Sequence, residues 1–160
     1  MKIALIGPGI MPIPPEGWGG VEHLIWNFAQ QLKKSGDEVT IINVPEHQRI
    51  VLEANSEEFD AVHLHYDQFA PVMKGIKCKK KMITSHYPYL ENPEPQYEFL
   101  YGYLKDSGCH IVSLSDRIKE EFVRRDIDGT NVSVLPCGIN TQLYTLDDTA
   151  LHPDRSVVVG

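Results

Sequence analysis

The sequence has 160 residues, 42% of them hydrophobic, and a formal net charge of −7, so it is long enough to bury the core of one ordinary domain. The acidic balance argues against a nucleic-acid-binding protein, which normally presents a basic face. No apolar stretch reaches the roughly 18–20 residues that a membrane-spanning helix needs. The first apolar run ends at Gly7 and Pro8, which is too early for an export signal and favours a cytoplasmic protein.

Short apolar runs alternate with amphipathic stretches along the chain. Six runs predict β-strands, at 2–6, 38–43, 60–65, 81–86, 110–115 and 131–136. Helical spacing predicts helices at 20–36, 93–108 and 116–125, the last with Asp116 near its N-cap, whereas 47–56 is ambiguous and could hold a short helix. Strands that alternate with helices and lack polar alternation are typical of a parallel sheet covered on both faces. We therefore predict an α/β fold, a Rossmann-like doubly wound parallel sheet of about six strands with helices on both faces.

The end of the chain has a different character. Residues 141–155 are polar and have the composition of a linker, and 156–160 ("SVVVG") have that of an opening strand. We expect residues 1–140 to form the Rossmann-like domain, and 141–160 to be a linker and the first strand of a missing C-terminal domain. A stray edge strand is the alternative.

The stretch "GPGIMPIPPEGWGGVEH" (7–23) joins the first predicted strand to the first predicted helix. It is not a dinucleotide-binding fingerprint, because Pro12 replaces the third glycine and the second strand ends in Asn43 instead of an acidic residue. This disfavours a nicotinamide-dependent oxidoreductase. Gly19 and Gly20 instead place bare backbone N–H groups at a helix N-terminus, where the helix dipole favours an anion such as a diphosphate. The alternative is that these glycines only turn the chain.

Two other sets of residues raise a metal or redox function. Cys78, Cys109 and Cys137 have no metal-type spacing, and an odd number of cysteines without an export signal favours reduced thiols. His63 and His65 point to the same side of a predicted strand, but no third ligand is evident nearby. We expect no metal site.

A family resemblance covers nearly the whole chain. "PPEGWGGVEHLIWNFAQQLKKSGDEVTII" resembles the opening of retaining, GT-B-fold glycosyltransferases of family 4. "FDAVHLH", "MITSH", "IVSLSDRIKEEF" and "VSVLPCGIN" follow in that family's order and at its spacing. The resemblance implies the N-terminal, acceptor-binding domain of a two-domain enzyme, in which the C-terminal domain holds most of the donor nucleotide.

The resemblance also assigns the donor site. Gly19 and Gly20 match the glycine loop whose amides contact the donor diphosphate and stabilise the leaving group. His86, in "TSH", matches the histidine beside the donor sugar and is the expected catalytic residue. The resemblance implies no protein nucleophile, no metal and no cofactor, since the nucleotide-sugar is a substrate.

Residues near the expected cleft could bind the acceptor. Tyr66 and Asp67 follow the third strand and Tyr87 follows His86, so these side chains could stack on or hydrogen-bond to an acceptor sugar. The four lysines within 77–81 could place the domain at an anionic membrane as a peripheral contact, although a solvated loop is the favoured reading.

The predicted function is therefore that of the N-terminal half of a retaining glycosyltransferase. The whole enzyme would move a sugar from a nucleotide-sugar donor to a hydroxyl of a glycan, lipid or small-molecule acceptor. The isolated chain is expected to be inactive without its C-terminal domain, and no nucleic-acid partner is expected. The alternative is a non-catalytic single domain that binds a glycan or a partner.

Overall fold

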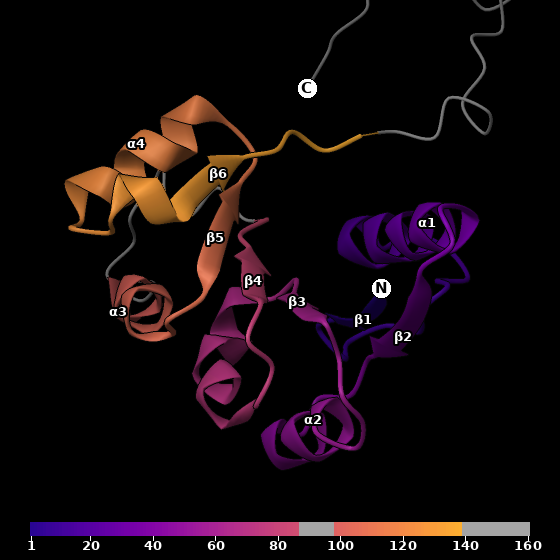
Figure 1. Ribbon diagram of the computed structural model, residues 1–160. Helices are drawn as coiled ribbons and strands as arrows, with labels where there is room; N and C mark the ends of the chain where they lie inside the picture. Colours follow the sequence, from indigo (N-terminus) through magenta and orange to yellow (C-terminus); the bar gives the residue numbers. More distant parts are fainter. Residues whose placement is uncertain (87–97, 139–160) are drawn as a thin grey trace, which may run out of the picture.

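The computed structural model describes residues 1–86 and 98–138. It contains a six-stranded, all-parallel sheet in the order β2-β1-β3-β4-β5-β6 (Figure 1). The strands are β1 (Lys2–Ile6), β2 (Glu38–Ile42), β3 (Ala61–Leu64), β4 (Lys81–Thr84), β5 (His110–Ser113) and β6 (Val132–Val134). The helices are α1 (Gly20–Lys34), α2 (His47–Ala54), η1 (Asp67–Gly75), α3 (Glu98–Asp106), α4 (Asp116–Arg124) and η4 (Gly129–Asn131). The predicted α/β, Rossmann-like fold is confirmed.

The two faces of the sheet are covered unequally. Only the first crossover, from β1 to β2, runs toward the β2 edge, and the later crossovers run toward β6. Because parallel crossovers are right-handed, this reversal places α1 on one face and α2, η1, α3 and α4 on the other (Figure 1). We call these the front face, under α1, and the back face. The strand order reverses between β1 and β3, where doubly wound sheets bind their ligands.

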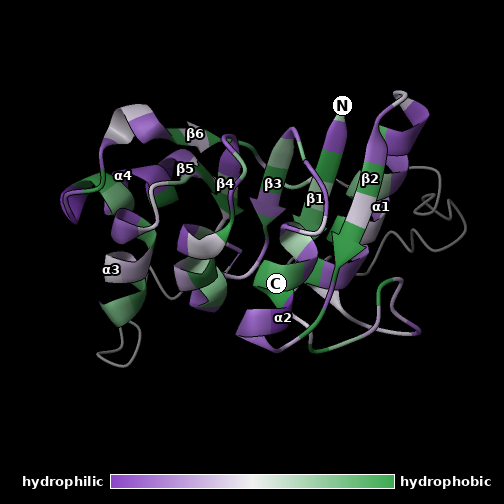
Figure 2. Ribbon diagram, turned by 60° about the horizontal axis from the view of Figure 1, so that its bottom comes forward, coloured by the Kyte–Doolittle hydropathy of each residue, from purple (hydrophilic) through white to green (hydrophobic). Residues whose placement is uncertain are grey.

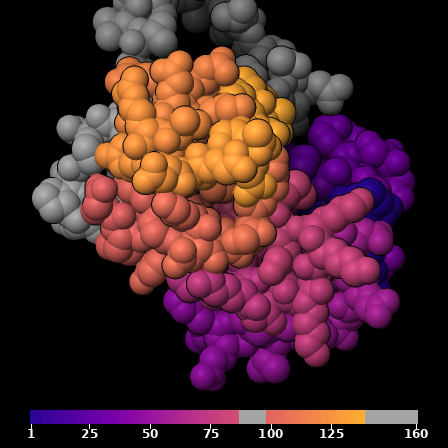
Figure 3. Space-filling view, turned by 60° about the vertical axis from the view of Figure 1, so that its left-hand side comes forward, coloured from indigo at the N-terminus to yellow at the C-terminus, as the bar shows by residue number. Residues whose placement is uncertain are grey.

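The back face carries the larger hydrophobic core. Alternate strand residues such as Leu64, Ile83 and Ile111 point to this side and are almost fully buried. Phe122 of α4 is the largest fully buried side chain of this core. In the space-filling view the surface continues without a break from η1 to α3 and α4 (Figure 3).

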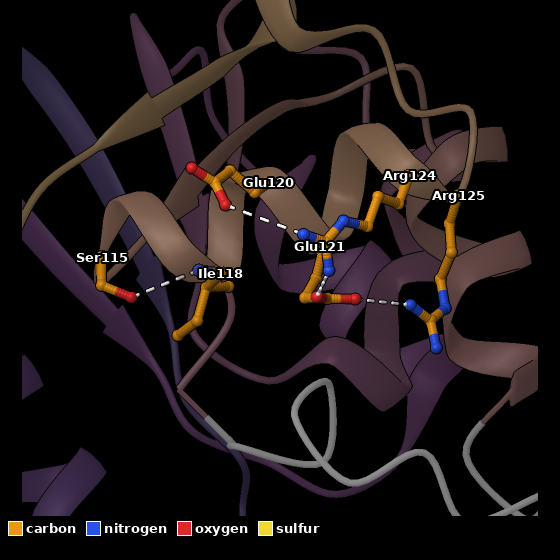
Figure 4. Close-up of polar contacts among 6 residues, drawn as sticks. All are labelled: Ser115, Ile118, Glu120, Glu121, Arg124 and Arg125. Atoms are coloured by element: carbon orange, nitrogen blue, oxygen red, sulfur yellow. Dashed lines mark hydrogen bonds and ion pairs between the residues drawn. The ribbon is translucent and has the colours of Figure 1, made fainter.

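Polar contacts hold α4 in this layer. Ser115 is the N-cap, and its Oγ accepts a hydrogen bond from the backbone N–H of Ile118 at 3.3 Å (Figure 4). Glu121 accepts hydrogen bonds from both Arg124 and Arg125. The Arg125 guanidinium also lies 4.1 Å from the centre of the Tyr101 ring on α3. The helix therefore begins one residue earlier than an Asp116 cap would place it.

The front face has a smaller core and a polar half. Under α1, a cluster of Ile3, Leu5, Ile25 and Ala29 is buried. Beyond β1 the front positions hold hydrogen-bonded polar pairs: His63 Nε2 with Thr84 Oγ1 at 2.6 Å, and His110 Nε2 with Ser133 Oγ at 2.8 Å. Colouring by hydropathy shows β3 turning hydrophilic toward its carboxyl end (Figure 2). The expectation that the strands lack polar alternation is thus wrong for the front of β3–β6.

Element boundaries agree with the predicted ones to within a few residues, with two exceptions. The predicted helix 93–108 is described only as α3, because its first part lies outside the described residues. The 3₁₀ helix η1 between β3 and β4 was not predicted, since it contains Pro71 and has a short, irregular pattern. The ambiguous segment 47–56 is helical as α2. The predicted linker and strand at 141–160 lie outside the described residues.

Candidate functional site

A cavity of about 480 Å³ opens on the front face of the sheet. Its floor is formed by β3, β4 and β5, one wall by α1, and the other by residues 135–138 after β6. Leu24 and Phe28 line it on α1 and Val112 on β5, and the amides of Asn27 and Gln31 also face it. A cavity of this size, apolar with a few polar groups, is typical of a small-molecule site.

Three histidines gather on the floor of this cavity. His65 Nδ1 and His86 Nε2 are 3.0 Å apart, which is a hydrogen-bond distance. The rings of His63 and His65 are 4.1 Å apart between centroids, and the Phe28 ring meets both histidines edge-on at 6.0 and 6.3 Å. The cluster therefore holds His86 in a fixed place at the carboxyl end of β4.

The three histidines are neutral at physiological pH. Burial, together with the nearby His86, lowers the pKa of His63 to about 4. Burial, together with His63 and His86, lowers the pKa of His65 well below its ordinary value. Burial likewise lowers the pKa of His86 to about 4. The cavity floor thus presents uncharged imidazoles, which can donate and accept hydrogen bonds.

Asn43 fixes the first part of the glycine loop. Its Oδ1 accepts a hydrogen bond from the backbone N–H of Gly9 at 2.9 Å, and its Nδ2 donates one to the carbonyl of Met11 at 2.7 Å. Gly9 has a φ of +66°, and a Cβ there would lie 2.5 Å from the backbone of Val44. Asn43, which occupies the position of the ribose-binding acid in a dinucleotide-binding fingerprint, therefore fixes the loop by two hydrogen bonds.

Gly19 and Gly20 form the N-terminus of α1, as predicted from the sequence. Gly19 has a φ of 152°, a conformation that favours glycine, and a Cβ on it would lie only 3.1 Å from the Glu22 carboxylate. A Cβ on Gly20 would meet no other atom within 4 Å. Among the described residues no side chain caps this helix, and its first cavity-lining residue, Leu24, is one helical turn away. The amide end of α1 therefore lies one turn from the cavity and has no side-chain cap within the described part of the chain; Gly20 is exposed there, whereas Gly19 is buried beside the Glu22 carboxylate.

Trp18 immediately precedes these glycines and points into solvent. Its side chain is 84% exposed, which is unusual for an indole. It therefore lies in solvent just before the N-terminus of α1.

The predicted acceptor residues lie in different surroundings. Tyr66 is half-buried, with its ring edge-on to Phe69 at 4.8 Å between centroids. Asp67 is buried and accepts a hydrogen bond from Ser85 Oγ at 2.6 Å, and burial raises its pKa to about 7. Tyr87 lies outside the described residues. The burial of Asp67 disfavours a direct contact with an acceptor, and the contacts of Tyr66 and Tyr87 stay predictions.

The structure also places the side chains that a metal ion or a thiol reaction would use. Within residues 1–86 and 98–138, no group of three or more His, Cys, Asp or Glu side chains is placed to hold a metal ion. Cys78, Cys109 and Cys137 are free. Cys137 lines the cavity, and burial raises the pKa of its thiol.

The lysines at 77–81 do not act as one group. Lys77, Lys79 and Lys80 are exposed, whereas Lys81 turns inward and donates to the carbonyl of Met73 at 2.8 Å. None of the described helices is both long enough and apolar enough to cross a membrane.

Sequence reasoning found His86 but missed the cluster around it. His63 and His65 were considered only as metal ligands, although β3 and β4 are adjacent strands whose carboxyl ends meet. The sequence signal for this cluster is the position of His63 and His65, two residues apart at the end of a buried strand.

Comparisons with known proteins add little to this description. No protein-family model and no curated protein matches this sequence. A solved structure of AviGT4, a glycosyltransferase involved in avilamycin A biosynthesis, aligns with a TM-score of 0.47 and 14% sequence identity. The alignment covers 84% of this chain and 64% of that chain, so this chain spans less than two thirds of its length. A likeness this distant carries no argument about activity.

Proposed function

We propose that this chain is the N-terminal domain of a retaining glycosyltransferase that uses a nucleotide-sugar donor. One observation carries the proposal: the uncapped amide end of α1 lies one helical turn from a cavity whose floor holds His86. The family resemblance of the sequence supports it, since Gly19, Gly20 and His86 are the residues that match the family's donor site. The proposal extends to a GT-B enzyme of family 4.

In this proposal the amides at Gly19 and Gly20 bind the donor diphosphate. Backbone N–H groups at a helix N-terminus stabilise the negative charge that develops as the diphosphate leaves. They are already in place before the reaction, so no reorganisation is needed at that moment.

His86 is proposed to contact the donor sugar beside the reacting carbon. As a neutral imidazole it orients the sugar by hydrogen bonding and adds no charge to the site. The acceptor hydroxyl then attacks from the face on which the phosphate leaves, and the leaving phosphate takes its proton. The protein supplies position and electrostatic stabilisation.

The remaining partners are part of the same proposal. Tyr66 and Tyr87 would contact the acceptor, whereas Asp67, which is buried and hydrogen-bonded to Ser85, would not reach it directly. A C-terminal domain would hold the nucleotide, and the 160 residues alone would not turn over the donor. The exposed lysines at 77, 79 and 80 precede the amino end of β4, whereas His86 follows its carboxyl end. Membrane contact through these lysines would therefore leave the cavity free.

The test is a titration of the ¹⁵N-labelled chain with UDP, GDP and their sugar conjugates, followed by NMR. We expect weak binding that shifts the amide signals of residues 19–22 and the ring signals of His86. Gly20→Val should abolish these shifts, because its side chain would occupy the approach to the amides, while its Cβ has open space in the free domain. Gly17→Val, in the same loop and equally open, is the matched control and should keep them.

Two results would contradict the proposal. Shifts confined to other surfaces, or equal shifts in the Gly20→Val and Gly17→Val variants, would separate nucleotide binding from the glycine loop. Binding of free glycans at the cavity without any response to nucleotides would favour the non-catalytic binding domain.

A further inference from the structure

The contact between His65 and His86 has the geometry of an imidazole pair joined end to end. The two ring planes are 20° apart and their centroids are 5.3 Å apart. This centroid distance exceeds the 3.0 Å between His65 Nδ1 and His86 Nε2 by about two ring radii. The rings are therefore nearly coplanar, and the N–H of one points at the lone pair of the other, as a hydrogen bond requires.

The surroundings decide which ring donates. His65 is 2% exposed, and its other nitrogen, Nε2, is buried with no hydrogen-bond partner among the described residues. A neutral imidazole has one N–H, so a proton on Nε2 would leave a buried donor unsatisfied. Buried N–H groups without an acceptor are rarer in proteins than unsatisfied acceptors. The proton of His65 therefore belongs on Nδ1, which donates to His86.

His65 is also held against rotation. The ring of His63 packs on it at 4.1 Å between centroids, and the Phe28 ring meets it edge-on. His63 is itself anchored by its hydrogen bond to Thr84. The donor direction of His65 is thus set by two packed rings.

We propose that His65 is a positioning residue that holds His86 in the tautomer with its proton on Nδ1. His86 Nε2 is occupied as an acceptor, so the ring presents one N–H donor, and its side chain lines the cavity. The cavity then selects a ligand that offers a hydrogen-bond-accepting oxygen at this point. That this oxygen belongs to a donor sugar rests on the proposed function, whereas the tautomer itself does not.

The wild-type chain alone gives the first test. Long-range ¹H–¹⁵N correlation of the ¹⁵N-labelled protein near neutral pH distinguishes protonated from unprotonated ring nitrogens. We expect His86 to carry its proton on Nδ1, in excess over the other tautomer by about tenfold or more, since the alternative leaves a buried donor unpaired. A protonated Nε2 on His86 would overturn the proposal. The readout needs no glycosyl transfer, so it stands apart from failure of the proposed function.

Variants test the role of His65. His65→Leu removes the donor with a side chain of similar bulk, and His86 should shift to the Nε2–H tautomer that neutral histidine favours in water. His65→Asn, which keeps an amide donor near the place of Nδ1, should retain the Nδ1–H tautomer. The control His110→Leu removes a histidine from the same face that is paired with Ser133 and should leave His86 unchanged. If the His86 tautomer is unchanged in His65→Leu, His65 does not set it and the proposal is wrong. If His65→Leu does not fold, loss of the Nδ1–H tautomer in His65→Asn contradicts the proposal instead.

Discussion

The back and front faces of this sheet are built from the same strands, but the back face forms the larger hydrophobic core and the front face lines the cavity. In β4, Ile83 points back into the core and Thr84 points forward into the cavity. In β5, Ile111 and Val112 divide in the same way. Because strand residues alternate with a period of two, one short strand supplies both stability and chemistry. All the described helices that pack on the sheet, apart from α1, lie on its back, because the later crossovers share one direction. Among the described residues this leaves the cavity at the front of β3–β5.

Truncating the same side chain on each face should give the largest difference. Phe122→Ala, in the fully buried back core, should lower the free energy of unfolding by about 3–5 kcal/mol, because it removes packed surface and leaves a cavity. Phe28→Ala, half-buried at the front cavity, should cost only about 1–2 kcal/mol. Urea unfolding at neutral pH measures both. Equal losses would mean that the front face contributes to the core as strongly as the back.

Asp67→Asn probes the buried carboxyl between η1 and β4. Burial raises the pKa of Asp67 from 3.8 to about 7, so the unfolded state loses its proton first, and stability falls as the pH rises from about 3.8 to about 7. Asparagine keeps an acceptor for Ser85 without that charge. The variant should be more stable than wild type by roughly 2–4 kcal/mol at about pH 8, with the gain shrinking toward pH 4. Thermal unfolding across this range would contradict the prediction if the gain did not depend on pH.

His63→Gln probes the opposite pH dependence on the front face. Its folded-state pKa of about 4 lies below the ordinary 6.5, so its stability contribution is complete above pH 6.5 and is lost as the pH falls toward 4. Glutamine can still hydrogen-bond to Thr84 but does not titrate. The variant should therefore lose roughly 2–3 kcal/mol less stability than wild type over this range, measured by urea unfolding. If the stabilities of the variant and the wild type changed in parallel with pH, His63 would be accessible to protons in the folded state.

Lys81→Met should have a smaller effect than the Asp67 and His63 variants. Lys81 Nζ hydrogen-bonds to the carbonyls of Met73 and Ile76 at the end of η1, so its loss should cost about 1–2 kcal/mol. Lys79→Met, at an exposed lysine of the same run, should change the stability by less than about 0.5 kcal/mol. Similar losses of stability in the two variants would mean that the hydrogen bonds of Lys81 to η1 do not stabilise the fold.

Much of the fold could be predicted from the sequence, because its signals are local. Runs such as 2–6 and 38–43 are apolar and bounded by glycine, proline or charged residues, and each became a strand. The helical spacing of apolar residues over 20–36 predicted α1, in which Ile25 and Ala29 are buried. The long loop before Gly19 was also evident, since its prolines exclude an earlier helix.

The site could be predicted only in part, because its contacts join distant residues. His65 and His86 meet only through the parallel register of β3 with β4. Asn43 holds the glycine loop across a longer separation in the sequence, and nothing in its own neighbourhood marks it. The burial of Asp67 depends on the 3₁₀ turn that it begins, for which the sequence shows no clear period.

The exposure of Trp18 gives this protein a built-in optical reporter. Its indole lies in solvent one residue before Gly19, whereas Trp26 is half-buried on α1. Trp18 will therefore emit at the red end of the tryptophan range and will be quenched readily by acrylamide. Any molecule that settles on the amide end of α1 will shield this indole, so a blue shift with reduced quenching will report occupancy without a label.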